Sequence, residues 1–129
     1  MGIKKVVTNL LKKTNLFNSV NFIILYGSVS RKKQTALSDI DVCISFDLNP
    51  KERIKVRMQL LGNLPENFDL QIFEDLPLYI KKEIFKGEIL YCKNKKKMFQ
   101  TSLEIIREYE DFKPIYEYYL ARDRSKLEI

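Results

Sequence analysis

The chain has 129 residues, of which 45% are hydrophobic, and this length suits one domain with a single core. Its 23 Lys and Arg residues outnumber 17 Asp and Glu residues, and the net charge of +6 favours polyanionic partners such as nucleotides, nucleic acids or acidic proteins. The chain has no His, and Cys43 and Cys92 lie far apart, so the composition argues against a zinc site built from Cys and His.

The sequence also lacks a run of about 18 to 20 apolar residues, the length that a membrane-spanning helix needs. The first residues, MGIKKVVTNLLKK, have neither the apolar centre nor the cleavage site of a signal peptide. We therefore expect a cytoplasmic protein that does not enter membranes. We expect one domain over residues 1–129, with a core at about 20–75 and C-terminal helices at about 76–129.

The first half of the chain alternates between helical and strand patterns. An amphipathic helix is predicted up to about Asn15, and a buried strand over 21–26 closes with Gly27. Residues 39–46 alternate, with the aliphatic side chains and Phe46 on one face and polar side chains or cysteine on the other. The polar set is Asp39, Asp41, Cys43 and Ser45.

The remaining elements are one more strand and several helices. A helix is predicted from Pro50 to Gly62, with an apolar stripe of Ile54, Met58 and Leu61. Residues 68–73 alternate as a third strand, and a helix that carries Leu76, Ile80 and Ile84 ends at Gly87. A last helical region carries Phe99, Leu103 and Ile106, and continues beyond Pro114 with Ile115, Tyr119 and Leu120.

Lysines gather between Lys81 and Lys97, where seven of them face only two glutamates, a local charge of +5. One interpretation is a solvated face and loop. The other is a docking site for an acidic partner or for the tail of a nucleotide.

Three aspartates form the pattern that carries chemistry. Residues two apart on a strand point to the same side, about 6.6 Å apart along its axis, so Asp39 and Asp41 present their carboxylates together. Asp69 adds a third carboxylate if its strand lies beside theirs. Three like charges would raise one another's pKa unless a cation were present. Two divalent ions about 4 Å apart would relieve this repulsion and would clamp an in-line displacement at phosphorus.

The residues ahead of the aspartates suit a phosphate. Gly27 allows a sharp turn and a close approach of the backbone to a ligand. Ser28 supplies a hydroxyl and a backbone N–H where phosphate oxygens are favoured. Arg31 can reach the same anion with its guanidinium.

The segment GSVSRKKQTALSDIDV resembles the signature of the minimal nucleotidyltransferases of the DNA polymerase β-like superfamily. The resemblance implies an α/β (α+β) fold with a small mixed three-stranded sheet flanked by helices and a helical C-terminal region. It implies that Asp39, Asp41 and Asp69 are catalytic and bind two Mg²⁺ ions, with Mn²⁺ as an alternative. It also implies that Gly27, Ser28 and Arg31 bind the nucleotide.

The implied reaction is the transfer of AMP from ATP to a hydroxyl group. The chain also resembles the antitoxins of two-gene modules in which the partner is a HEPN-family ribonuclease toxin and the acceptor is a tyrosine of that toxin. We expect that this reaction does not require a nucleic acid as a partner. Two alternatives remain open: an antitoxin that neutralises the toxin by binding alone, and a transferase that modifies a small molecule.

Aromatic residues are frequent near the C-terminus, in the segment EYEDFKPIYEYYLARDR. One interpretation is a helix that closes over the sheet. The other is that several tyrosines contact the toxin, because aromatic residues are enriched in the centres of protein interfaces.

Overall fold

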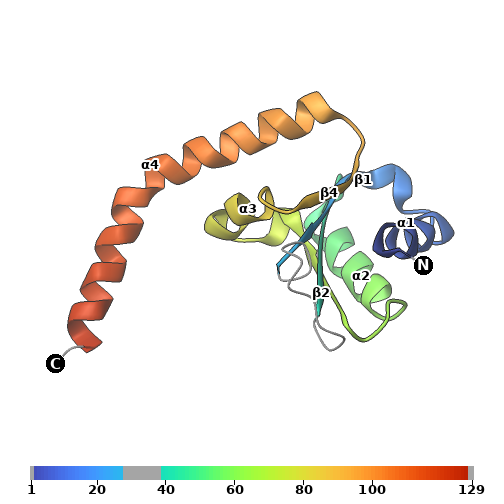
Figure 1. The fold of residues 1–129 in the computed structure, drawn as a ribbon, viewed down its shortest axis with the longest axis horizontal. Helices are drawn as coiled ribbons and strands as arrows, with labels where there is room; N and C mark the ends of the chain where they lie inside the picture. The colour runs from blue at the N-terminus through green and yellow to red at the C-terminus, as the bar shows by residue number, and fades with distance from the viewer. Residues whose placement is uncertain (1, 28–38, 128–129) are drawn as a thin grey trace.

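The computed structural model describes residues 2–27 and 39–127 of the chain, and Figure 1 shows a sheet with helices on both faces. Two short 3₁₀ helices accompany the longer elements, η1 at Phe17–Ser19 and η2 at Phe73–Asp75. The helices and strands in chain order are α1 (Ile3–Lys13), β1 (Val20–Tyr26), β2 (Ile40–Phe46), α2 (Pro50–Leu61), β3 (Phe68–Ile72), α3 (Leu78–Ile84), β4 (Glu88–Cys92) and α4 (Lys95–Leu127).

The sheet is mixed, and its strand order is β3-β2-β1-β4. Strands β2 and β3 are parallel and are connected through α2, whereas β1 is antiparallel to both of its neighbours. The three predicted strands are confirmed. The prediction of only three strands is wrong, since β4 lies within the lysine-rich stretch. Its five residues are at least partly exposed, so this edge strand lacks the apolar signal of a buried one.

Helices α1 and α2 cover one face of the sheet. Val7 and Leu11 of α1 are buried there, as the helical spacing predicts. The apolar stripe predicted for α2 is wrong, because Ile54 and Met58 are 63% and 70% exposed. The buried side chains of α2 are instead Val56 and Leu60.

The orientation of α2 follows from hydrogen bonds that hydropathy does not encode. Asn49 and Glu52 form a capping box that sets the start of the helix. One turn later, Arg53 pairs with Asp75, and Arg57 donates from Nε to the carbonyl oxygen of Leu70 at 3.2 Å. These two arginines direct that side of α2 toward β3 and η2, so Ile54 and Met58 face away.

Helices α3 and α4 cover the other face of the sheet. The rings of Phe22, Phe73 and Phe85 meet in pairs there, with centroid distances between 5.1 and 5.8 Å. Cys43 and Ser45 share this face and are 0% and 2% exposed. Alternation therefore assigned them to the correct side of β2, although both side chains are buried by the elements that pack on it.

The last predicted helical region is a single helix, α4, which is continuous over 33 residues and contains Pro114. Among the α4 side chains that the structure describes, Met98 and Ile105 are the buried apolar ones. The stripe of Phe99, Leu103 and Ile106 that the sequence predicted is largely exposed. The second half of α4 extends away from the sheet (Figure 1), so the interpretation that it closes over the sheet is wrong. No helix in the described part of the chain is both long and apolar enough to span a membrane.

Candidate active site

Gly27 follows β1 directly and has a φ of 78°, a conformation that side-chain-bearing residues rarely adopt. A Cβ atom at this position would collide with the Oδ2 atom of Asp41. The glycine is thus required both by its backbone conformation and by the carboxylate that packs against it. The predicted neighbours Ser28 and Arg31 lie outside the described residues.

Asp41 and Asp69 are register partners on the parallel strands β2 and β3. Both side chains are partly buried, and Gln71 donates from Nε2 to Oδ1 of Asp69 at 3.3 Å. Asp39 is exposed and comes directly before β2. The sequence predicted that Asp69 lies beside Asp41 if the two strands are neighbours. The parallel pairing of β2 with β3 confirms this.

Negative charge gathers where Asp39, Asp41 and Asp69 lie. Burial raises the pKa of Asp41, and the charges of Asp69 and Asp39 raise it further. Burial likewise raises the pKa of Tyr26, which is the register partner of Asp41 on β1, and the charges of Cys43, Asp41 and Asp69 add to the effect. Within the described residues, no ion pair with Lys or Arg compensates these carboxylates.

The carboxylates of Asp41 and Asp69 are suitable ligands for a divalent cation. Carboxylate oxygens are the preferred ligands of Mg²⁺, and a cation between Asp41 and Asp69 would remove the repulsion that raises the pKa of Asp41. The described residues do not, however, include a group of three acidic, Cys or His side chains arranged to hold a metal. Asp41 and Asp69 together fit a cation, and Asp39, which comes directly before β2, lies close enough for its charge to act on Asp41.

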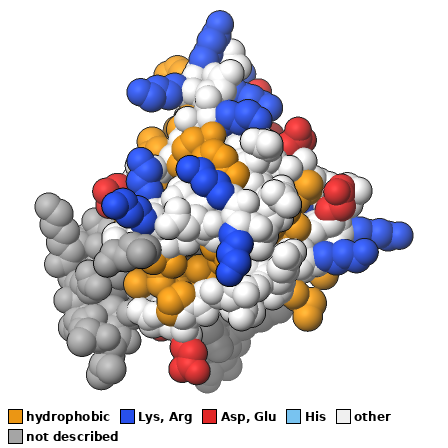
Figure 2. Space-filling model, turned by 90° about the vertical axis from the view of Figure 1, so that its right-hand side faces the viewer, with side chains coloured by type: hydrophobic (Ala, Val, Ile, Leu, Met, Phe, Trp, Pro, Cys, Tyr) orange, Lys and Arg blue, Asp and Glu red, His pale blue; other side chains and the backbone are white. Residues whose placement is uncertain are grey.

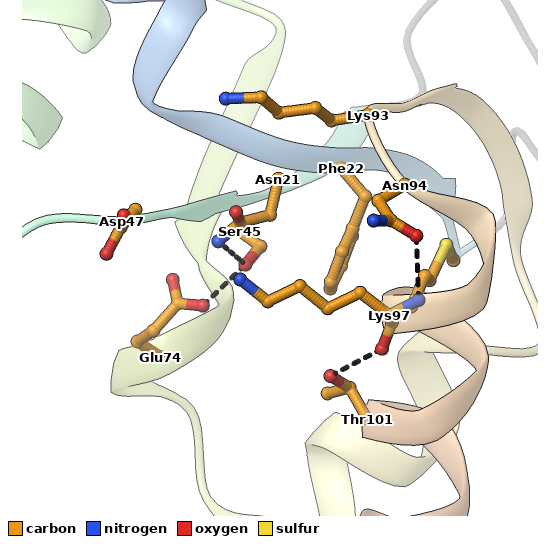
Figure 3. Close-up of a pocket in the computed structure, with 10 residues that line it drawn as sticks. Asn21, Phe22, Ser45, Asp47, Glu74, Lys93, Asn94, Lys97 and Thr101 are labelled. Carbon is orange, nitrogen blue, oxygen red and sulfur yellow. Dashed lines mark hydrogen bonds between the residues drawn. The ribbon is translucent and has the colours of Figure 1, made fainter.

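A second polar cluster lies toward the other end of β2 and was missed by the sequence analysis. Glu74 accepts hydrogen bonds from the Ser45 hydroxyl at 2.5 Å and from the backbone N–H of Phe46 at 2.9 Å. Asn21 in turn donates to the Ser45 hydroxyl at 3.2 Å. Lys97 extends from α4 toward Glu74 and Ser45 (Figure 3).

These side chains line a cavity of about 420 Å³ between the sheet and the start of α4. Phe22 and Met98 also line it. The only sequence signal for the cluster was that Ser45 shares the polar face of β2 with Asp41. Glu74 and Lys97 come from distant parts of the chain, so spacing could not connect them.

Solved structures resemble this fold over nearly the whole chain. A toxin–antitoxin complex with AMP-PNP matches with a TM-score of 0.77 and 17% identity, over 95% of this chain and 99% of the matched chain. A complex from Shewanella oneidensis, of a tri-AMPylated HEPN toxin with an MNT antitoxin, contains a chain that matches with a TM-score of 0.70 and 16% identity. That match covers 94% of this chain and 95% of the other. At these identities the likeness concerns the fold.

Sequence comparison gives the closer relationship. "Putative protein adenylyltransferase MJ1547" of Methanocaldococcus jannaschii is 38% identical over 95 residues, which are 73% of this chain and 67% of that protein. The family model for polymerase beta nucleotidyltransferases matches residues 5–96, a range that contains all four strands. The chain belongs to the polymerase beta nucleotidyltransferase family.

Proposed function

We propose that this chain is a protein adenylyltransferase, which transfers AMP from ATP to a hydroxyl group of a partner protein. The observation that carries the proposal is the register pairing of Asp41 with Asp69 beside Gly27. The name of the relative from M. jannaschii supports a protein as the acceptor. The AMP-PNP in one of the structural neighbours supports ATP as the nucleotide.

In this proposal, Asp39, Asp41 and Asp69 are the catalytic carboxylates and would hold two Mg²⁺ ions, with Mn²⁺ as an alternative. Such ions neutralise the charge of the phosphates and make a hydroxyl a better nucleophile. Gly27 lets the backbone approach the triphosphate, because no side chain stands between the turn and the ligand. Ser28 and Arg31 would bind phosphate oxygens from the segment that follows.

The protein's own part in the reaction is to position the reactants and accept a proton. A bond forms between the acceptor oxygen and the α-phosphorus, the bond to the bridging oxygen of the β-phosphate breaks, and pyrophosphate leaves. In this proposal the carboxylate of Asp69 accepts the proton of the attacking hydroxyl. Gln71 orients that carboxylate by donating a hydrogen bond to it at 3.3 Å. Positioning and electrostatics supply most of the rate in this class of reaction, so a small domain suffices.

We further propose that the acceptor is a HEPN-family toxin and that the chain acts as its antitoxin in the cytoplasm. Support comes from the structural neighbours, one of which is an MNT antitoxin in complex with an AMPylated HEPN toxin. We also propose that residues 1–129 form one domain. The second half of α4, which extends away from the sheet (Figure 1), would then contact the partner.

Intact-protein mass spectrometry tests the proposal. The purified chain is incubated with ATP, Mg²⁺ and a HEPN-family protein as the candidate acceptor, in parallel with Asp39→Asn/Asp41→Asn. We expect the partner to gain the mass of one or more AMP units with the wild type and none with the double variant. Asp47→Asn is the matched control, because Asp47 is exposed and lies beyond the opposite end of β2. An unmodified partner in the presence of the wild type would contradict the proposal.

A second candidate is an antitoxin that neutralises its partner by binding alone. The exposed apolar residues in the second half of α4 favour it, since Phe112, Ile115 and Tyr118 are 47%, 53% and 65% exposed. Under this alternative the partner stays inhibited in complex with Asp39→Asn/Asp41→Asn. Release of toxin activity by the double variant would favour the enzyme.

A further inference from the structure

Strand β4 forms an edge of the sheet. It pairs with β1 on one side, and on its other side it has no strand partner in the part of the chain that the structure describes. An edge strand presents backbone N–H and C=O groups with which an extended segment of another chain can pair. Ile89 in this strand is 55% exposed, so the edge also carries an accessible apolar side chain.

A largely apolar groove of about 360 Å³ runs beside this edge. It lies between β4, the end of α3 and the first turns of α4, and it is lined by Phe85, Ile89, Cys92, Lys95, Met98, Phe99 and Ser102. Phe99 is 62% exposed, and the neighbouring Leu103 and Ile106 of α4 are 44% and 43% exposed. We call β4 and this groove, together with these two residues, the β4 surface.

The β4 surface overlaps the lysine-rich stretch between Lys81 and Lys97, which contains β4 and the start of α4. Lys95 lines the groove, Lys96 follows it, and neither has an ion pair within the described residues. Lys86, just before β4, pairs with Glu83 at 3.1 Å. Basic side chains are prominent around apolar ones on the face that Figure 2 shows. Lys95 and Lys96 therefore favour negative charge beside the groove.

We propose that the β4 surface binds an extended, acidic segment of a partner protein. The segment would add a strand to the edge of β4, place apolar side chains in the groove against Phe99, and direct carboxylates toward Lys95 and Lys96. A second copy of this chain fits less well, because both copies carry a net charge of +6 and the same lysines would meet.

The position of β4 explains how such binding would serve the transfer reaction. Leu25 of β1 is the register partner of both Glu88 and Val42, so the start of β4 is level with the part of β2 that carries Asp41. Strands lie about 4.8 Å apart, and two such steps, roughly 10 Å, separate β4 from β2. That the docked partner is also the acceptor of AMP rests on the proposed function; the surface itself does not.

Fluorescence anisotropy with a defined peptide tests the proposal. The probe is a fluorescein-labelled peptide in which Glu alternates with Val, and its counterpart carries Lys in place of Glu. We expect saturable binding of the acidic peptide only, with increased hydrogen-exchange protection of the amides in β4. Equal binding of both peptides, no binding, or protection confined to other strands would overturn the proposal.

Two variants with a matched control locate the site. Ile89→Ala/Phe99→Ala removes exposed apolar anchors, and Lys95→Glu/Lys96→Glu places acidic residues in the first turn of α4, where they are compatible with the helix dipole. Each is expected to weaken binding of the acidic peptide by about tenfold or more. The control Lys51→Glu/Lys55→Glu makes the same charge change on exposed positions of α2 and is expected to bind like the wild type.

Two further measurements separate this proposal from its alternatives. The Asp39→Asn/Asp41→Asn chain is expected to bind the acidic peptide as the wild type does, because the aspartates are not part of the β4 surface. A wild type that binds the peptide but transfers no AMP would contradict the proposed function alone. A wild type that transfers AMP without binding the peptide contradicts the β4 surface alone. Sedimentation of the free chain as a dimer that Ile89→Ala/Phe99→Ala dissociates would assign the surface to a second copy and overturn the acidic partner.

Discussion

Gly27 and Asp41 are packed so closely that a methyl group on the glycine would overlap the carboxylate of the aspartate. The two residues are far apart in sequence and are brought together by the antiparallel pairing of β1 with β2, in which Tyr26 is the register partner of Asp41. A turn that is proposed to bind phosphate and a carboxylate that is proposed to bind metal thus share one small volume.

Replacement of Gly27 by Ala is expected to disturb both the fold and the site. The φ of 78° costs a side-chain-bearing residue about 1 to 2 kcal/mol, and the new methyl group must displace the Asp41 carboxylate. We expect a lower free energy of unfolding and a loss of AMP transfer that exceeds the loss of stability. Chemical denaturation and a transfer assay measure the two effects.

Gly62→Ala is the control for that experiment. Gly62 caps α2 at a φ of −68°, and its Cβ atom would have ordinary contacts, with the carbonyl oxygen of Met58 at 3.5 Å. We expect unchanged transfer and a stability equal to the wild type or higher by about 0.4 to 1 kcal/mol. Similar losses in the two glycine variants would show that the contact with Asp41 is unimportant.

The Asp41→Asn variant is expected to be more stable than the wild type at neutral pH without added metal. Folding raises the pKa of Asp41, so the ionised carboxylate costs free energy in the native state, and this cost disappears as the pH falls below the ordinary value of about 3.9. The side chain is only partly buried and solvent screens its charge, so we expect a gain below about 1 kcal/mol. Thermal unfolding at pH 7 and pH 3 measures it; a gain that is larger at pH 3 would refute the explanation.

Divalent cations are expected to stabilise the wild type. Binding to the native state alone adds free energy in proportion to the logarithm of the ligand concentration, and a cation also relieves the repulsion between Asp41 and Asp69. We expect the melting temperature to rise with Mg²⁺ or Mn²⁺ and to fall again with a chelator. Asp41→Asn/Asp69→Asn should lose most of the response, and Asp47→Asn, which lies beyond β2, should keep it. An unaltered response in the double variant would place the cation elsewhere.

Glu74→Ala is expected to lower the free energy of unfolding by about 1 to 3 kcal/mol, because the buried Ser45 hydroxyl and the Phe46 amide lose their acceptor. Urea denaturation measures this cost. Glu66→Ala, in an exposed loop position, is the control and should change stability by less than about 0.5 kcal/mol. Equal stabilities of the two variants would show that the hydrogen bonds of Glu74 contribute nothing.

The two cysteines are expected to differ in reactivity. Cys43 is 0% exposed, and burial together with the charge of Glu74 raises the pKa of its thiol. Cys92 is partly exposed and lines the groove beside β4. We expect iodoacetamide to modify only Cys92 in the native protein and both thiols in denaturant, as read by peptide mass spectrometry. Rapid modification of native Cys43 would contradict its burial.

The sequence by itself determined the local order of most elements and the residue types of the site. A continuous apolar run located β1, alternation located β2 and β3, and the pattern from Gly27 to Asp41 indicated the family to which the chain belongs. These signals are readable because each is local: a strand repeats every two residues, and the spacing of a motif is counted along the chain.

Tertiary structure decided what depends on neighbours. Strand β4 exists because β1 offers it an edge, α2 is oriented by the hydrogen bonds of Arg53 and Arg57, and Asp69 reaches Asp41 through the parallel register. The sequence could not predict that Phe99 is exposed, because the helical pattern of apolar residues is the same whether or not another element covers them. Covering, register and edge pairing are properties of two segments at once, so a pattern read along one segment does not contain them.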